Sequence, residues 1–316
     1  MLLDYIKKDA GDIFSFPGSY DDYRQTFDHD FNMSRTCNEA VTVKSFAGAV
    51  DEWPVGLETL RNLYRFNFAT RDQLSRLLKL KGLDDSEMFD AVLEKYIERK
   101  FINKFCLAQA PLDTIPGDAM TVYCLDHSAK FILGHFTNDP NIINTWKSSN
   151  CMYSGNIVFK YLTTNEFYIS MCEVKGLDTS TFEPAPDFII RGRAVRLSGW
   201  FRVKSEGKTE NILLEAVRQS DLPLTWEKKV DTHLTPFIKE NFASRYFSGD
   251  PTWFFVTDSQ NSALQIAEIF ERMTECRRYR LTTSEELRKG LDRAVFYKYE
   301  SGKLLPTKPK IFAAKS

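Results

Sequence analysis

Two carboxylates in the second half of the chain are candidates for chemistry. Asp187 follows a proline at the start of a short apolar run, PDFII, and Glu215 lies inside a second apolar run, LLEAVRQ. Both runs are typical of strands, and carboxylates on neighbouring strands offer the hard oxygen ligands that Mg²⁺ prefers. A Mg²⁺ ion held there can activate water and stabilise phosphoryl charge. Asp187 and Glu215 are therefore the candidate catalytic and metal-binding residues of a nuclease.

Such a site also needs a cation beside the attacking water. The position two residues after Glu215 is Val217, which cannot supply one. Arg218 points to the other face of the strand, because side chains alternate along it. Lys228 or Lys229, on the helix predicted to follow, could reach the site in its place.

The alternative is a catalytically dead site, and we favour it. In that case Glu215 pairs with a basic neighbour, Asp187 caps a turn, and no cofactor is needed. Mg²⁺ is expected only if the nuclease alternative holds.

The first half of the chain predicts a winged helix-turn-helix over residues 53–138. Apolar residues recur there at helical spacing, and Thr70 can cap the second helix. The predicted elements are helices near 57–64, 70–78, 84–100 and 128–136, with wing strands at 101–107 and 121–125.

The third predicted helix has the wrong charge for reading DNA. Its exposed face carries Glu87, Asp90, Glu94 and Glu98, where a reader of the major groove needs basic or amide side chains. Carboxylates facing phosphates are repulsive. This charge favours a winged helix that docks a protein partner, or that meets DNA through another surface.

The remaining regions complete a chain of the α+β class. We expect a packed N-terminal arm over 1–52, a linker helix over 139–165, and an α/β domain with a mixed sheet over 166–316. The expected strands and helices of that domain are strands at 166–174, 185–190, 194–204, 211–219, 252–257, 278–282 and 295–299, with helices at 225–242 and 261–273.

Basic residues that could follow a phosphate backbone occur in both halves, although an ordinary solvated face explains them equally well. The candidate DNA-binding residues are Arg71, Arg76, Lys79, Arg191, Arg193, Arg196, Arg202 and Lys204.

The composition limits the class of protein and the ways in which it could bind DNA. The 316 residues are 43% hydrophobic and 27% charged, with a formal net charge of −1, so a DNA binder of this kind must concentrate its bases locally. Six scattered cysteines show no zinc spacing and are typical of free thiols in a reducing compartment. The first residues do not form a signal peptide, and no run approaches the roughly 18 apolar residues of a membrane span. We expect a cytoplasmic protein with no membrane partner.

The order of these features resembles a known family. A Pro-Asp at the first hairpin, a Glu on the third strand, the helix WEKKV and the strand WFFVT are similar to the PD-(D/E)XK restriction-endonuclease-like fold. Placed behind a winged helix, they resemble the replication-relaxation family of plasmids and integrative elements over about residues 55–300. The resemblance implies a DNA-associated regulatory or accessory protein of a mobile genetic element, which acts in replication or transfer by binding. A Mg²⁺-dependent nuclease and a protein-docking adaptor are the alternatives.

Overall fold

The computed structural model describes residues 4–8, 19–31, 42–44, 46, 52–137, 139–175, 177–190, 192–205, 207–239, 243–247 and 249–312. The chain forms two compact units, which from Tyr20 onward divide between Val158 and Phe159, while Ser19 belongs to the second unit. No described helix has the length and apolar character that a membrane crossing requires.

Three helices with well-defined starts dominate the first unit. Helix α2 (Trp53–Phe66) begins with a proline in its first turn. Helix α3 (Arg71–Lys79) is capped by Thr70 through a reciprocal capping box. Helix α4 (Ser86–Glu98) begins at Asp85, whose carboxylate accepts the Met88 amide at 2.9 Å. These caps satisfy backbone donors that would otherwise lack partners.

A four-stranded sheet completes this unit, in the order β1-β3-β4-β2. Strands β3 (Ile102–Ala108) and β4 (Val122–Leu125) pair antiparallel, and the two-residue β2 (Ala69–Thr70) pairs with β4. Strand β1 (Arg24–Phe27), which the sequence did not suggest, adds to the outer edge of β3. This pairing ties part of the N-terminal region to the body of the unit.

The helices α5 (Ala129–Phe136) and α6 (Asn141–Thr145) are followed by the short helix η2 (Ser148–Cys151) and the long helix α7 (Gly155–Glu173). The strand expected at residues 166–174 is wrong, because this segment forms the end of α7. The helix is buried on most sides, and its buried residues include Thr163, Asn165 and Ser170. Without a solvated polar stripe, the sequence shows no helical period there.

The second unit is built on a seven-stranded sheet, whose mixed character the sequence predicts, although strands β5 and β13 were not expected. Its order is β13-β12-β11-β10-β9-β8-β5, in which β9, β10 and β11 are parallel and the other pairs are antiparallel. The strands are β5 (Asp178–Pro184), β8 (Gly199–Ser205), β9 (Lys208–Val217), β10 (Thr252–Thr257), β11 (Tyr279–Thr283), β12 (Phe296–Glu300) and β13 (Lys303–Thr307).

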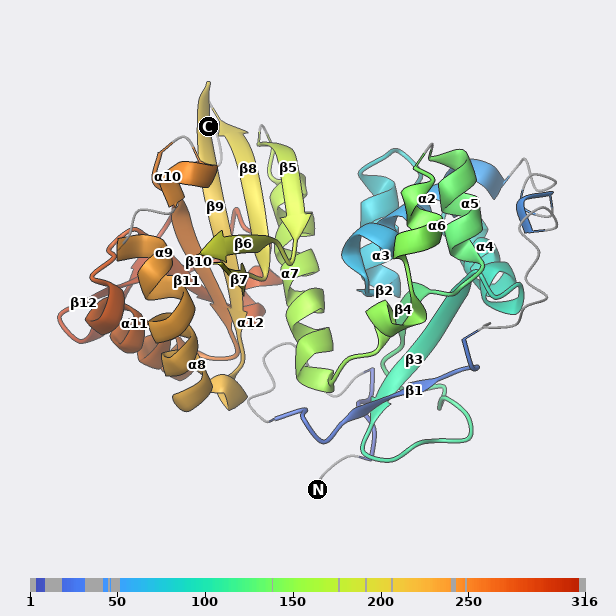
Figure 1. Cartoon of the computed structure of the whole chain (residues 1–316), viewed down its shortest axis with the longest axis horizontal. Helices are drawn as coiled ribbons and strands as arrows, with labels where there is room; N and C mark the ends of the chain where they lie inside the picture. The colour runs from blue at the N-terminus through green and yellow to red at the C-terminus, as the bar shows by residue number, and fades with distance from the viewer. Residues whose placement is uncertain are drawn as a thin grey trace. The chain divides into compact units, whose positions relative to one another are not determined.

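Helices cover both faces of this sheet (Figure 1). Parallel neighbours need crossover connections, and helices supply them here. Between β9 and β10 lie η3 (Gln219–Asp221), α8 (Leu224–Lys229), η4 (Val230–Leu234), α9 (Thr235–Lys239) and α10 (Ala243–Tyr246). Helix α11 (Gln260–Thr274) follows β10, and α12 (Ser284–Leu287) and η5 (Lys310–Phe312) come later. The crossover helices share one apolar core with the sheet, while α7 packs Phe167 on Phe201 and Phe254 of the other face.

The single strand expected at 194–204 is divided in the structure. Strand β7 (Arg193–Arg196) pairs with β6 (Asp187–Ile190) in a separate two-stranded hairpin, and β8 begins at Gly199 in the large sheet. At the break, the Leu197 amide bonds to Pro186 and the Ser198 amide bonds to Leu214. The chain thus leaves its pairing with β6 and begins to pair with β9 at Ser198. The alternation of apolar and polar residues continues through this point, so the sequence does not indicate the break.

We predict that Phe201→Ala lowers the free energy of unfolding by about 3–5 kcal/mol, because a large buried ring leaves a cavity. Phe201 has 0% exposure and contacts the rings of Phe167 and Phe182. Chemical unfolding followed by tryptophan fluorescence measures the change. Ile189→Ala is the control, since Ile189 is 55% exposed and should cost no more than about 0.5 kcal/mol. Equal losses in the two variants would contradict the packing described.

Candidate functional site

Glu215 lies in the middle of the second unit's sheet, on the face covered by the crossover helices. It pairs in register with Phe255 of β10, and its neighbours on the same face, Leu213 and Val217, belong to the apolar core. Glu215 is only 3% exposed. A carboxylate in such surroundings requires compensation for its charge.

Two side chains from different elements compensate Glu215. Lys229, at the end of α8, forms an ion pair with Oε1, and the Ser198 hydroxyl donates to the same oxygen at 3.2 Å. Ser198 also accepts the Ala216 amide at 3.0 Å, which fixes its hydroxyl. Oε2 of Glu215 has no hydrogen-bond partner within the described ranges.

The lysine that reaches Glu215 is Lys229, while its neighbour Lys228 is exposed. Successive side chains of an α-helix point about 100° apart around the helix axis, so Lys228 and Lys229 cannot both reach Glu215. Of the two lysines that the sequence offered, the structure therefore selects the second. Ser198 was missed, because its place beside Glu215 depends on the register between β8 and β9.

Asp187 belongs to a different surface. Its carboxylate binds the Arg196 guanidinium through two hydrogen bonds of 2.9 and 2.5 Å. The hydrogen bonds from Arg196 lower the pKa of Asp187 below its ordinary value. Asp187 and Arg196 lie opposite each other on the two strands of the hairpin, and both are exposed. Phe188, the residue after Asp187, points to the other face and is buried. Asp187 thus lies on the outer face of the hairpin.

The two candidate carboxylates therefore engage different cations. Glu215 is held by Lys229 and Asp187 by Arg196. Over the residues that the structure describes, no group of three or more His, Cys, Asp or Glu side chains is placed to hold a metal ion. The arrangement around Glu215 is suited to holding a lysine in place.

Arg218 also has a structural role at the end of β9. Its guanidinium pairs with Asp258 at 3.0 Å, and both side chains are almost fully buried. It also lies 5.2 Å from the centre of the Phe159 ring. Asp258 follows β10, so this ion pair joins the carboxyl ends of two parallel strands.

Some of the predicted DNA-binding residues already contact another side chain of the protein, and others form no ion pair. Arg71 forms a bidentate pair with Asp90, and Arg76 pairs with Asp72 at 3.5 Å. Arg196 is held by Asp187, and Arg202 lies 5.5 Å from the ring of Trp200. Arg191 lies outside the described residues. Among these candidates, the exposed bases for which no ion pair is found within the described part of the chain are Lys79, Arg193 and Lys204.

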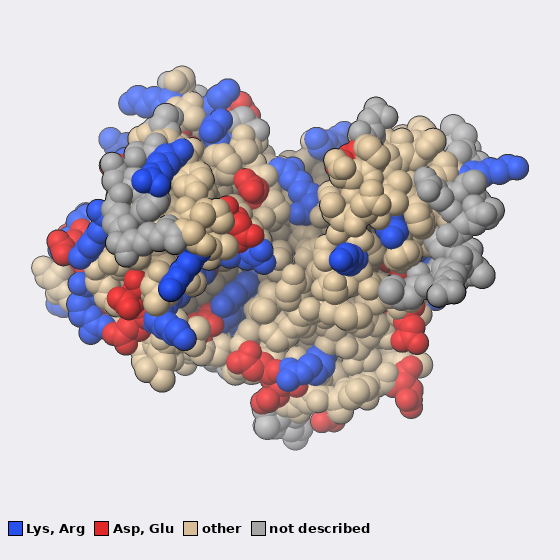
Figure 2. Space-filling view, viewed as in Figure 1, with Lys and Arg blue, Asp and Glu red and all other residues tan. Residues whose placement is uncertain are grey.

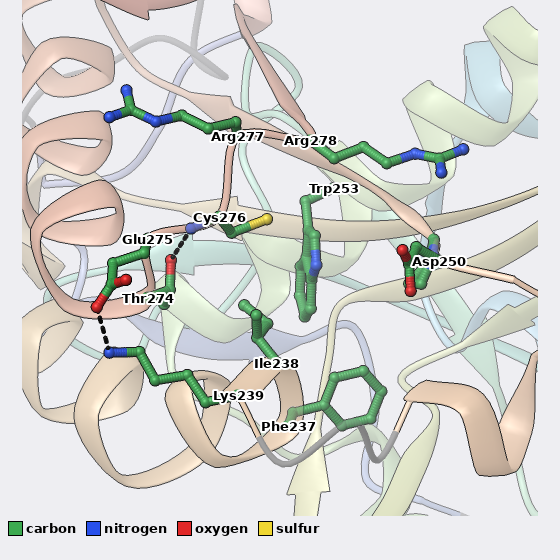
Figure 3. A pocket seen from close by; sticks show the side chains of 11 residues that line it. Phe237, Ile238, Lys239, Asp250, Trp253, Thr274, Glu275, Cys276, Arg277 and Arg278 are labelled. Carbon is green, nitrogen blue, oxygen red and sulfur yellow. Dashed lines mark hydrogen bonds and ion pairs between the residues drawn. The ribbon is translucent and has the colours of Figure 1, made fainter.

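A separate cavity of about 480 Å³ opens near the start of β10. In Figure 3 the thiol of Cys276 and the ring of Trp253 point into it, whereas Arg277 points away. Lys239 pairs with Glu275 at 2.9 Å, and burial raises the pKa of Cys276. The cavity includes neither candidate carboxylate in its lining. The lining residues are Phe237, Ile238, Lys239, Asp250, Pro251, Trp253, Thr274, Glu275, Cys276, Arg277 and Arg278.

Comparison with known proteins assigns no family. No protein-family model matches this chain, and no curated protein matches it. A solved structure of the restriction endonuclease FokI is similar with a TM-score of 0.29 and 14% sequence identity. The match covers 74% of this chain and 43% of that one. A TM-score this low supports no conclusion about the site.

We predict that Lys229→Met lowers the free energy of unfolding by about 1–3 kcal/mol. Removing one partner of a fully buried ion pair costs roughly 3–5 kcal/mol, and water recovers part of this because the Lys229 side chain is 27% exposed. Adding Glu215→Gln should restore at least half of the loss, because it removes the unpaired charge. Chemical denaturation measures all three variants. Lys228→Met is the matched control, and a loss as large in the control would contradict this role.

We predict that His233 makes the protein less stable in mild acid. Burial and the charge of Lys229 lower the pKa of His233, so the unfolded chain binds a proton more readily than the folded one. The free energy of unfolding should fall as the pH drops from about 6.5, the ordinary histidine value, toward the lower folded value. In His233→Gln this dependence should be weaker. Denaturation at a series of pH values tests it, and identical slopes in both proteins would refute it.

Proposed function

We propose that this protein binds DNA and acts by binding rather than by turnover, as a regulatory or accessory factor in the replication or transfer of a plasmid or integrative element. The observation that supports the absence of turnover is that the two candidate carboxylates are engaged apart, Glu215 by Lys229 in the core and Asp187 by Arg196 on the outer face of the hairpin. A carboxylate already neutralised by a lysine has less charge to offer a divalent ion. The mobile-element context follows from the family resemblance of the sequence.

We propose further that the first unit is a winged helix-turn-helix and that the second is a degenerate PD-(D/E)XK-like domain. Support for the first comes from the order α2-β2-α3-α4-β3-β4, with β4 paired to both β2 and β3. Support for the second comes from antiparallel strands leading into a parallel β9-β10 pair joined by helices. In this interpretation Ser198 stands beside Glu215 where a metal site would need a second carboxylate.

The candidate basic residues that form no ion pair are the proposed DNA contacts. Lys79 lies at the end of α3, Arg193 on β7, and Lys204 on β8. Figure 2 shows Lys and Arg spread over the visible face of the second unit, with Asp and Glu among them. Cations without an internal partner are the ones that can neutralise phosphates and release counterions.

A second candidate function is the docking of a basic protein partner on α4. Glu87, Glu94 and Glu98 are exposed on this helix, and the structure gives them no ion pair within the described residues. Asp90 is instead occupied by Arg71. A surface of this sign repels DNA and attracts basic groups.

We predict that the full chain binds duplex or single-stranded DNA in a gel-shift titration, with affinity that falls as salt rises. Lys204→Ala should weaken binding and reduce the salt slope by somewhat under one unit. Lys298→Ala is the matched control, because the Lys298 ammonium is exposed but already paired with Glu300, and it should leave the slope unchanged. No Mg²⁺- or Mn²⁺-dependent cleavage should accompany binding. Failure to bind at about 50 mM salt would refute the proposal. Cleavage that is lost in Glu215→Ala would instead establish the nuclease alternative.

A further inference from the structure

The cavity at the start of β10 takes no part in the proposed DNA binding. Its lining comes from the end of α9 and from the chain entering β10 and β11. Glu215 instead lies in the middle of the sheet, in register with Phe255. The cavity volume of about 480 Å³ is within the range of roughly 300–1,000 Å³ that small-molecule sites occupy. The cavity is therefore large enough for a small ligand of its own.

The inner wall of the cavity is aromatic and apolar. Phe237 and Trp253 are 1% and 2% exposed, and their ring centres lie 5.8 Å apart at nearly a right angle. Ile238 is half-buried and packs against the same core. Aromatic walls favour an apolar ring, which can pack against their faces and edges.

The same wall holds a hydrogen-bond donor that is not used internally. The indole N–H of Trp253 donates to no group of the described residues, although the side chain is almost fully buried. In Figure 3 the Trp253 ring lies in the cavity, with the Cys276 thiol on one side and Asp250 on the other. Buried indole N–H groups usually have an acceptor. A ligand that carries an acceptor would supply it.

Arg278 places an available guanidinium at the mouth. Its carbonyl accepts the Trp253 amide at 3.0 Å, and its Nε donates to the Thr252 hydroxyl at 3.0 Å. Arg278 is exposed and forms no ion pair with the described residues, so both terminal nitrogens can donate to a ligand. Arg277 differs, because it pairs with Glu271 and points away from the cavity in Figure 3.

Asp250 supplies the opposite charge at the mouth. It is exposed, and it has no ion pair within the part of the chain that the structure describes. In Figure 3 Asp250 and Arg278 extend to the same side of Trp253. The mouth therefore offers one negative and one positive charge beside one apolar wall.

We propose that this cavity binds an α-amino acid with an aromatic side chain. The ligand carboxylate binds the Arg278 guanidinium and the ligand ammonium binds Asp250, while the ring packs against Phe237 and Ile238. Charge-assisted hydrogen bonds of this kind are the strong ones, and a carboxylate oxygen can also accept the Trp253 N–H. A zwitterion leaves neither charge of the mouth unpaired, whereas a simple anion or cation leaves one of them without a partner. This inference does not depend on DNA binding.

The carboxylate contact is tested by titrating the full chain with L-phenylalanine in a calorimeter. We expect saturable binding by the wild type, and an affinity at least about tenfold lower in Arg278→Gln, because a hydrogen bond between charged groups is lost. Arg277→Gln is the matched control and should bind as the wild type does. No saturable binding by the wild type, or equal affinities in the two variants, would overturn the site.

The ammonium contact is tested with 3-phenylpropionate, which has the ring and the carboxylate but no ammonium. The wild type should bind it more weakly than L-phenylalanine, and Asp250→Asn should abolish this preference. Asp250 and Arg278 are both exposed, so their substitution should change the free energy of unfolding by no more than about 0.5 kcal/mol. Equal binding of the two ligands by the wild type, or a preference that persists in Asp250→Asn, would refute the assignment of a zwitterion.

Discussion

The burial of Glu215 imposes a condition that the rest of the second unit must satisfy. A carboxylate that is 3% exposed loses most of its hydration, which costs several kcal/mol unless other groups replace the water. Lys229 and Ser198 do so from two separate elements, one from the helix after β9 and one from the break before β8. The helix phase and the strand register are therefore linked through one side chain, and a shift in either would leave the charge uncompensated.

Much of this domain could be predicted from local patterns. The apolar runs that contain Glu215 and Trp253 are strands, and the mixed sheet follows from their alternation with helices. The sequence lacks a cation two places after Glu215, which directs attention to the following lysines, and Lys229 is the one that pairs with Glu215. These features depend on neighbours within a few residues, where the spacing of side chains is fixed by geometry.

The remaining features depend on contacts between distant segments. Ser198 lies beside Glu215 only because β8 pairs with β9 in one register, and nothing in the alternation around Ser198 announces that the strand breaks there. The end of α7 was mistaken for a strand because its polar residues are buried along with its apolar ones. In both cases the tertiary environment decides the outcome, and a single sequence carries no direct record of it.

The positions of basic residues in the sequence did not indicate which of them are free of intramolecular ion pairs and so open to a ligand. Arg193 and Arg196 are three residues apart and look equivalent, but the period of the strand puts them on opposite faces, and only Arg196 meets a carboxylate. The same distinction separates Arg71, bound to Asp90, from Lys79, which stays exposed.

For a chain with a formal net charge of −1, the number of basic residues left without an ion pair matters more than the total number of basic residues. The acidic face of α4 repels a polyanion, so under the proposed function the DNA contacts are expected where cations of the described residues remain unpaired. A protein of nearly balanced charge can therefore bind DNA locally when internal ion pairs neutralise some of its bases and leave a few open to phosphate.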